Sequence, residues 1–126
     1  MTQALVSLGA NTPDKREQLA RTIEAISLIA HIEAQTPIYD TPAEGSVATK
    51  PYANALLLID TPDSYEALRA TFKEWETAAG RTPMSKQQGI IPLDIDIIRW
   101  DNTILKERDM EFEYMKKGLQ YLEGKL

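Results

Sequence analysis

The sequence contains no cysteine and a single histidine. The absence of cysteine excludes disulfide bonds, thiolate zinc sites and a cysteine nucleophile. Acidic residues outnumber basic ones, and the formal net charge of -5 argues against nucleic acid as a partner. No apolar run approaches the length of a membrane span, and the N-terminus lacks the basic start and apolar segment of a signal peptide. We therefore expect a cytoplasmic protein with no membrane partner.

The 126 residues are enough for one hydrophobic core, so we expect one domain over residues 1–126. Apolar or alternating runs predict strands at 4–8, 31–41, 52–60 and 92–100, with a short extra strand at 103–107. Within the second of these runs, Pro37 suggests an edge strand or a bulge. Apolar residues at helical spacing predict helices over 12–30, 61–80 and 109–126, with loops over 41–51 and 81–89.

The first two predicted helices follow the same tripeptide, Thr-Pro-Asp, at 12–14 and 61–63. We expect Thr12 and Thr61 to be the N-caps, and Gly80 to end the second helix. The order of elements is then βαββαβ followed by a C-terminal helix. This order predicts an α+β, ferredoxin-like fold, in which an antiparallel sheet carries both central helices on one face.

Two carboxylates interrupt the apolar run "PLDIDII" at 92–98. Residues two apart on a strand point to the same face, so Asp94 and Asp96 project together, while Leu93, Ile95 and Ile97 point into the core. Two neighbouring carboxylates repel each other unless a cation binds between them, and Mg²⁺ prefers oxygen ligands. The pair could also hold two metal ions that bridge the phosphates of a nucleotide. The alternative is the solvated face of a half-buried strand.

Further short motifs accompany the aspartates in a fixed order: "VSLGAN" (6–11), "YDTPAEG" (39–45), "PYANALL" (51–57) and "EWETAAGR" (74–81). Together with "PLDIDII" they resemble the 6-hydroxymethyl-7,8-dihydropterin pyrophosphokinase family, in register from about residue 4 to 100. The resemblance implies transfer of pyrophosphate from ATP to 6-hydroxymethyl-7,8-dihydropterin in folate biosynthesis. It also implies Mg²⁺ as cofactor, a pterin and ATP as ligands, and other folate-pathway enzymes as partners.

The resemblance also assigns roles to single residues. It implies that Asp94 and Asp96 bind two Mg²⁺ ions that hold ATP, and that Glu76 and Arg81 lie beside the nucleotide. The implied catalytic set is Asp94, Asp96, Arg81 and Lys86. The implied pterin pocket contains Asn54, which hydrogen-bonds the ring, together with Thr41, Pro42, Tyr52 and backbone near residues 43–45. The sequence Gly9-Ala10-Asn11 resembles the Gly-Ser-Asn that ends the family's first strand.

The loop before the aspartates departs from the family pattern. The family has roughly Arg-x-x-x-Arg-Trp-Gly-Pro-Arg-Thr-Leu-Asp-Leu-Asp, whereas this chain has "RTPMSKQQGIIPLDID" at 81–96. Lys86 is the only cation that follows Arg81 in that loop. The family's Pro-His segment is absent, with Phe112 near the histidine position, and its ring-stacking phenylalanine is missing, with Leu119 or Gln120 nearby. Reduced activity is expected, because phosphoryl transfer requires neutralisation of charge.

Two alternatives remain: a non-catalytic pterin- or nucleotide-binding relative, and an unrelated two-metal nucleotidyl-transfer domain. The cations of the tail could replace the missing arginines, or they could point into solvent: Lys106, Arg108, Lys116 and Lys117. Each assigned residue has a structural alternative as well. Asn54 could satisfy a buried backbone group, Tyr52 could pack, Thr41-Pro42 could form a turn, and Arg81 could be solvated. We expect His31 to be structural and Trp75 to belong to the core.

Overall fold

The computed structural model describes residues 1–42 and 50–124, in which six strands form one antiparallel sheet. The strands are β1 (Thr2–Ala10), β2 (His31–Gln35), β3 (Tyr39–Thr41), β4 (Tyr52–Thr61), β5 (Asp94–Trp100) and β6 (Thr103–Ile104). The helices are α1 (Lys15–Ile29), α2 (Tyr65–Ala78), α3 (Pro83–Gln87) and α4 (Glu113–Tyr121), and a 3-10 turn, η1, spans Arg108–Glu111. The strand order is β2-β4-β1-β5-β6, and β3 pairs with β4 beyond β2. This arrangement confirms the predicted α+β, ferredoxin-like fold.

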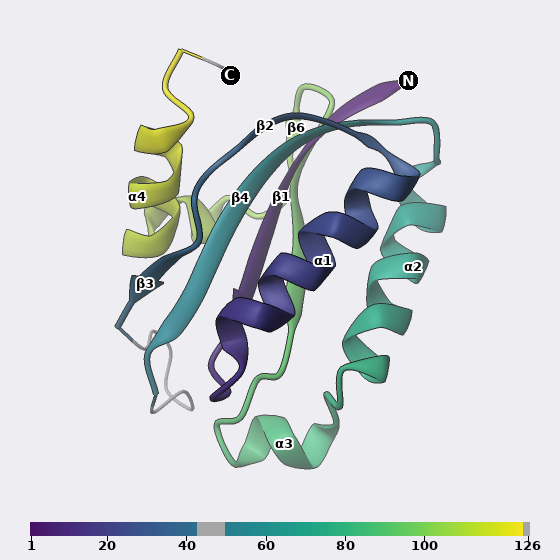
Figure 1. The fold of residues 1–126 in the computed structure, drawn as a ribbon. Helices are drawn as coiled ribbons and strands as arrows, with labels where there is room; N and C mark the ends of the chain where they lie inside the picture. The colour runs from purple at the N-terminus through teal and green to yellow at the C-terminus, as the bar shows by residue number, and fades with distance from the viewer. Residues whose placement is uncertain (43–49, 125–126) are drawn as a thin grey trace.

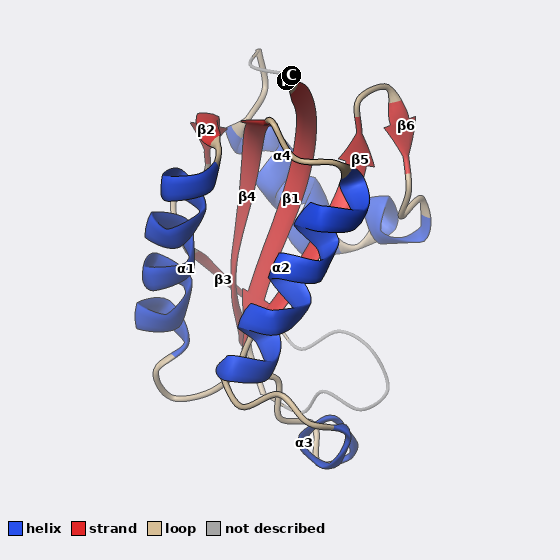
Figure 2. Ribbon diagram, turned by 90° about the vertical axis from the view of Figure 1, so that its right-hand side faces the viewer, coloured by secondary structure: helices blue, strands red, loops and turns tan. Residues whose placement is uncertain are grey.

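Helices cover both faces of the sheet (Figures 1 and 2). Helices α1 and α2 lie on one face, where Leu8, Leu57 and Ile95 pack with side chains of both helices in the main core. Helix α4 lies against the other face, over a smaller cluster that contains Leu5 and Leu56. Residues of opposite parity along each strand therefore face different layers, as the two-residue period of a strand requires.

A bulge in β5 lies just after the two aspartates. Val6 pairs with Ile97 and Leu5 pairs with Arg99, so Ile98 is an extra residue in the strand. The bulge turns Trp100 toward the helix layer, where its ring meets Tyr65 edge-on with centroids 5.7 Å apart. The strand before the bulge keeps its simple alternation, so both aspartates lie on the face opposite α1 and α2.

The predicted helix N-caps, Thr12 and Thr61, are wrong. The N-cap of α1 is Asp14, whose carboxylate accepts a hydrogen bond from the Thr12 hydroxyl at 2.7 Å. The N-cap of α2 is Ser64, whose hydroxyl accepts a backbone hydrogen bond in the first turn. The Thr61 hydroxyl instead accepts from the backbone N–H of Asp63 at 3.1 Å. Each Thr-Pro-Asp therefore forms the turn that precedes a helix.

The predicted strand 31–41 is two strands, β2 and β3. Between them, Thr36 leaves the regular ladder, and its hydroxyl accepts from the backbone N–H of Leu56 at 3.0 Å. Pro37, which follows, has no N–H to donate, so strand pairing cannot run through this point. The break lets β3 begin a separate pairing with the first residues of β4.

Four other differences from the prediction concern the second half of the chain. The expected loop 81–89 contains α3, because Thr82 and Ser85 cap each other's backbone N–H groups and Pro83 occupies the first turn. The strand expected at 103–107 shortens to β6, and the one expected from residue 92 begins at Asp94. The final helix is divided into η1 and α4 by an extended residue, Phe112.

Helix α4 lies very close to the sheet. The hydroxyl of Tyr39 donates to the carbonyl of Tyr114 at 2.6 Å. A Cβ added at Gly118 would lie 2.4 Å from the Tyr39 hydroxyl and 2.5 Å from Leu56 Cδ1, so only glycine fits this contact. Among the helices of residues 1–42 and 50–124, none is long and apolar enough to cross a membrane.

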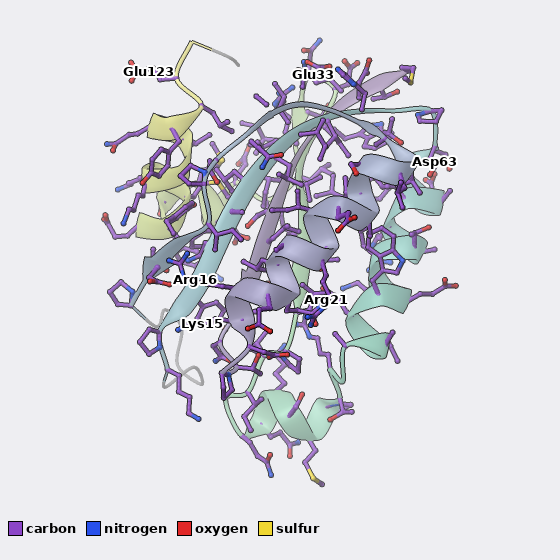
Figure 3. All side chains as sticks on the ribbon, viewed as in Figure 1. Lys15, Arg16, Arg21, Glu33, Asp63 and Glu123 are labelled. Carbon is purple, nitrogen blue, oxygen red and sulfur yellow. The ribbon has the colours of Figure 1, made fainter. Side chains whose placement is uncertain are left out.

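The start of α1 holds the end of the sheet that carries β3. Arg16 lies in the first turn of α1 (Figure 3). It forms an ion pair with Asp40 at 3.0 Å and donates to the carbonyl of Ile38 at 3.1 Å. These contacts position β3, and with it Thr41, which faces away from the main core.

Candidate active site

A cavity of about 150 Å³ opens on the sheet face opposite α1 and α2. Strands β1, β3, β4 and β5 supply most of its lining, and Pro42, η1, Phe112 and the start of α4 supply the rest. We call it the central cavity. Its lining residues are Ser7, Gly9, Thr41, Pro42, Tyr52, Asn54, Asp94, Asp96, Asp109, Phe112 and Tyr114.

Asp94 and Asp96 face the central cavity side by side, and their side chains are hydrogen-bonded to each other. Burial, together with the charge and hydrogen bond of Asp94, raises the pKa of Asp96 to about 8, and Lys106 opposes the rise. Two carboxylates held this close share a proton when no cation is bound. The pair therefore favours binding of a positive ion.

Arg81 and Glu76 anchor Asp94 from the helix side. Arg81 Nη1 donates to Asp94 Oδ1 at 2.8 Å and to Glu76 Oε2 at 3.0 Å. Glu76 is only 3% exposed, and it also accepts from the backbone N–H of Ile95 at 2.8 Å and pairs with Lys73 at 3.2 Å. Arg81 is therefore fixed by two carboxylates rather than solvated, and Glu76 ties α2 to β5.

The opposite side of the central cavity is polar and aromatic. The side-chain amide of Asn54 donates to the hydroxyl of Thr41, and both residues are buried. The ring of Tyr52 lies over the backbone of Gly9, where an added Cβ would approach it to 3.4 Å, and burial raises the pKa of the Tyr52 hydroxyl. Phe112 reaches the cavity from the C-terminal segment. This side can bind a flat ring that carries hydrogen-bonding groups.

A second cavity, of about 360 Å³, lies at the outer edge of β5, between α2 and the segment that follows β6. We call it the edge cavity, and its lining residues are Tyr65, Arg69, Phe72, Lys73, Ile95, Asp96, Ile97, Leu105 and Lys106. Asp96 lines both cavities. The two cavities therefore meet at the aspartate pair.

The edge of β5 is open beside this cavity. Strand β6 pairs only with Arg99 and Trp100, so it leaves the earlier part of β5 uncovered on that side. The backbone N–H of Ile95 points away from β1, because it donates to Glu76. Residues two apart in an antiparallel strand orient their backbone groups alike. The N–H and C=O of Ile97 therefore point outward at the edge cavity as well.

Most residues singled out in the sequence come together. Six of them line the central cavity, namely Thr41, Pro42, Tyr52, Asn54, Asp94 and Asp96, and Glu76 and Arg81 bond directly behind Asp94. Lys86 is exposed on α3 and lines neither cavity. The pocket backbone expected near residues 43–45 falls outside the described residues.

Asn11 has a structural function near the site. Its side chain donates to the carbonyl of Gly89 at 2.8 Å and accepts from the N–H of Ile91 at 2.6 Å. These bonds fix the end of the 81–91 segment to the end of β1, just before the aspartates. His31 is exposed at the start of β2. Trp75 packs against the main core, as expected.

Several lining residues were not predicted from the sequence. Ser7 had a usable signal, because it is the polar position between two buried residues of β1. Arg69 and Lys73 had a weaker one, since they lie four apart on one face of α2. Asp109 and Tyr114 had none. Lys106 was considered as a replacement cation and Phe112 lies near the family's histidine position, but the segment after residue 100 contains no motif that places either of them on the sheet.

Comparison with known proteins agrees with this geometry. A family model described as 7,8-dihydro-6-hydroxymethylpterin-pyrophosphokinase (HPPK) matches residues 5–123. Proteins named 2-amino-4-hydroxy-6-hydroxymethyldihydropteridine pyrophosphokinase from Mycobacterium bovis and Mycobacterium tuberculosis are 31% identical over 113 residues, covering 88% of this chain. A protein of the same name from Methylorubrum extorquens is 30% identical over 103 residues, covering 80% of this chain.

The chain spans 58% of the length of the mycobacterial proteins and 65% of the Methylorubrum protein. The family model nevertheless runs through every element from β1 to α4, including both aspartates and the lining of both cavities. The chain therefore belongs to the 7,8-dihydro-6-hydroxymethylpterin-pyrophosphokinase family.

Proposed function

We propose that this chain transfers the β,γ-pyrophosphoryl group of ATP to the hydroxymethyl group of 6-hydroxymethyl-7,8-dihydropterin. The observation that carries the proposal is that Asp96, with Asp94 beside it, lies at the junction of two cavities of different chemistry. One is aromatic and polar, and the other carries three cations. Acceptor and donor can then meet at the point where the charge of the phosphates is neutralised.

The aspartate pair fits Mg²⁺. Asp94 and Asp96 present their carboxylate oxygens side by side to the central cavity, and a hard cation prefers such oxygens. Within the described ranges, no group of three or more His, Cys, Asp or Glu side chains is arranged to hold a metal. Water and phosphate oxygens would complete the coordination, as is usual for magnesium in phosphoryl transfer. Bound Mg²⁺ would neutralise and orient the phosphates.

The central cavity would bind the pterin. Asn54 offers its amide carbonyl, because its NH₂ group is already bonded to Thr41, and a carbonyl suits the ring's amino and N–H donors. Tyr52 and Phe112 offer aromatic faces on which the ring can stack, and Pro42 lines the entrance side. This side would hold the acceptor with its hydroxymethyl group toward the aspartates.

The edge cavity would bind the nucleotide. The outward N–H and C=O of Ile97 form a donor and an acceptor on one edge, which matches the polar edge of a purine base. Tyr65 adds an aromatic face to the same lining. Glu76 and Arg81 would lie beside the phosphates, with Arg81 held 2.8 Å from Asp94.

The reaction would be a single displacement at the β-phosphorus. The hydroxymethyl oxygen forms a bond to the β-phosphorus, the bond from that phosphorus to the oxygen bridging the α-phosphate breaks, and AMP leaves with that oxygen. The hydroxyl proton is lost to solvent as the new bond forms. The chain itself orients the two substrates, and Arg81 counters the negative charge that develops beside Asp94.

The deciding experiment measures AMP release from ATP, Mg²⁺ and 6-hydroxymethyl-7,8-dihydropterin. We expect AMP that depends on the pterin, and a loss of at least about 10³-fold in the double variant Asp94→Asn with Asp96→Asn. AMP formation that is independent of the pterin, or unchanged in the double variant, would contradict the proposal. Circular dichroism of the variant checks that its fold is retained.

A second candidate function is binding without turnover, and one observation favours it. The segment 82–92 contributes no cation to either cavity, since Lys86 is exposed on α3. A non-catalytic relative would bind the pterin or the nucleotide and release no AMP. Titration of the pterin fluorescence in the same samples separates this case from an inactive preparation.

A further inference from the structure

Three cations surround the edge cavity. Arg69 and Lys73 come from α2, and Lys106 comes from the segment that follows β6. Two backbone bonds fix that segment, because the N–H groups of Leu105 and Lys106 both donate to the carbonyl of Ile98, at 2.7 and 3.3 Å. The cations therefore converge from two separate elements on one cavity that also reaches Asp96.

The arrangement leaves positive charge unneutralised. Arg69 and Lys73 lie four residues apart on α2, a spacing that costs stability when both charges have the same sign. Lys73 has a partner in Glu76, at 3.2 Å. Among the described residues, Arg69 and Lys106 form no side-chain hydrogen bond or ion pair, although Lys106 lies near enough to Asp96 to oppose the rise in the pKa of that carboxyl group. A bound anion would remove this repulsion.

The cations continue toward the aspartates. Lys73 and Arg81 bind the two oxygens of the same carboxylate, Glu76, and Arg81 also binds Asp94. A line of positive groups thus runs from the edge cavity to the aspartate pair. A polyphosphate that lay along this line would meet the edge-cavity cations at one end and Arg81 at the other.

We propose that Arg69, Lys73 and Lys106 form the polyphosphate-binding site of this chain, and that they supply the charge that segment 82–92 does not. The inference rests on the proposed function for the identity of the anion as a nucleoside triphosphate. It assigns the neutralisation of phosphate charge to α2 and to the link after β6.

The other cations of the tail are placed elsewhere. Lys117 lies over the ring of Tyr39, with its Nζ 5.6 Å from the ring centroid, and donates to the carbonyl of Asp40. Lys116 lies on the outer side of α4, and Arg108 is exposed in η1. None of these three lines either cavity. Of the four cations considered in the sequence, only Lys106 is positioned to act on the nucleotide.

Calorimetric titration of the full chain with MgATP and with adenosine tests the assignment. Arg69→Gln and Lys106→Gln should each weaken MgATP binding about tenfold, since each removes one charge-assisted contact to phosphate. Adenosine lacks phosphates, so its affinity should change by less than about twofold. Lys106→Arg should retain MgATP affinity. Added KCl should weaken MgATP binding less in the double variant Arg69→Gln with Lys106→Gln than in the parent protein, because fewer charged contacts remain to be screened.

Arg108→Gln is the matched control, because it removes a neighbouring exposed charge that lines neither cavity. MgATP affinity that is unchanged in the double variant Arg69→Gln with Lys106→Gln would overturn the inference. An equal loss for adenosine and MgATP would do so too. The proposed function can fail separately: charge-dependent MgATP binding without pterin-dependent AMP supports this site and rejects turnover. Pterin-dependent AMP with unchanged MgATP affinity in the variants rejects the site alone.

Discussion

The two cavities that meet at Asp96 are built in different ways. The central cavity is lined mainly by side chains of four strands, and its polar groups bond to one another, as in the pair Asn54 and Thr41. The edge cavity takes its cations from one face of α2 and from a short link, and two of them, Arg69 and Lys106, form no ion pair among the described residues. The polar groups of the central cavity are therefore held in place by one another, whereas the edge cavity is surrounded by separate positive charges.

The difference fits what each of the two proposed ligands demands. A flat ring is recognised by hydrogen bonds and stacking, which fail when a group moves by about an ångström. Phosphate charge is neutralised by Coulomb attraction, which falls only slowly with distance. A cation that neutralises phosphate can therefore be supplied by a helix instead of a loop, whereas the residues that would bind a ring have to come from fixed positions on the strands. Four predictions test this contrast.

The largest effect should come from Glu76, which links α2 to β5 through its bonds to Arg81 and to the N–H of Ile95. Glu76→Ala removes the acceptor of Arg81, Lys73 and the buried N–H of Ile95, so we expect the free energy of unfolding to fall by about 3 kcal/mol. Glu76→Gln keeps an acceptor for the N–H and should cost clearly less. Urea denaturation measures both, and equal losses would show that the Ile95 bond is unimportant.

The next effect concerns the wall of the central cavity. In Gly118→Ala the new methyl group would overlap the hydroxyl of Tyr39, so α4 must move away from the sheet. We expect a loss of about 2 kcal/mol in unfolding free energy and weaker pterin binding, with MgATP binding retained. Lys116→Ala, on the outer side of the same helix, is the control. If MgATP affinity fell in parallel with pterin affinity, the two cavities would not be independent.

A smaller effect is expected at the aromatic face of the central cavity. Phe112→Leu keeps an apolar side chain but removes the ring, and pterin affinity measured by fluorescence should fall about tenfold. Phe112→Trp keeps an aromatic ring and should retain most of the parent's pterin affinity. Tyr121→Leu removes an aromatic side chain that is 49% exposed and lines neither cavity, so its pterin affinity should match the parent. A tenfold loss in that control would assign the effect to α4 packing.

The residues of the central cavity that lie on strands could largely be predicted from the sequence. The alternation in "PLDIDII" placed Asp94 and Asp96 on a common face, because the strand period acts locally. The motifs around Asn54 and Tyr52 also lie within strands whose order was correctly predicted. For the strand residues of the central cavity, the strand period and the resemblance to the family were together sufficient to place them at one site.

The residues that reach the two cavities from the segment after residue 100 could not be placed from the sequence, because only the tertiary structure brings them to the sheet. Lys106 reaches the edge cavity because the link after β6 bonds to Ile98, and Phe112 reaches the central cavity because Gly118 lets α4 approach the sheet. The prediction of Thr12 and Thr61 as helix N-caps was wrong for a local reason. Each Thr-Pro-Asp bonds within its own turn, and this competes with capping.

The smallest effect tests the point where the cavities meet, through the pH dependence of stability without metal. The raised pKa of Asp96, about 8, means that the folded protein holds a proton that the unfolded chain loses near its ordinary pKa of 3.8. This contribution to stability is fully present below pH 3.8 and is lost as the pH rises through 8. Asp94, Asp109 and Lys106 are the charged groups that act on Asp96.

Asp96→Asn keeps a hydrogen-bond donor toward Asp94 and cannot ionise. In metal-free buffer we therefore expect its midpoint of thermal unfolding to exceed that of the parent by about 3 to 5 °C at pH 9, with little difference at pH 4. Mg²⁺ should raise the parent's midpoint at pH 9 and have less effect on the variant, because the cation replaces the shared proton only where two carboxylates remain. A difference between the two proteins that is the same at pH 4 and pH 9 would mean that Asp96 does not hold that proton. The junction between the ring-binding and phosphate-binding sides would then have to be neutralised by Arg81 and Lys106 alone.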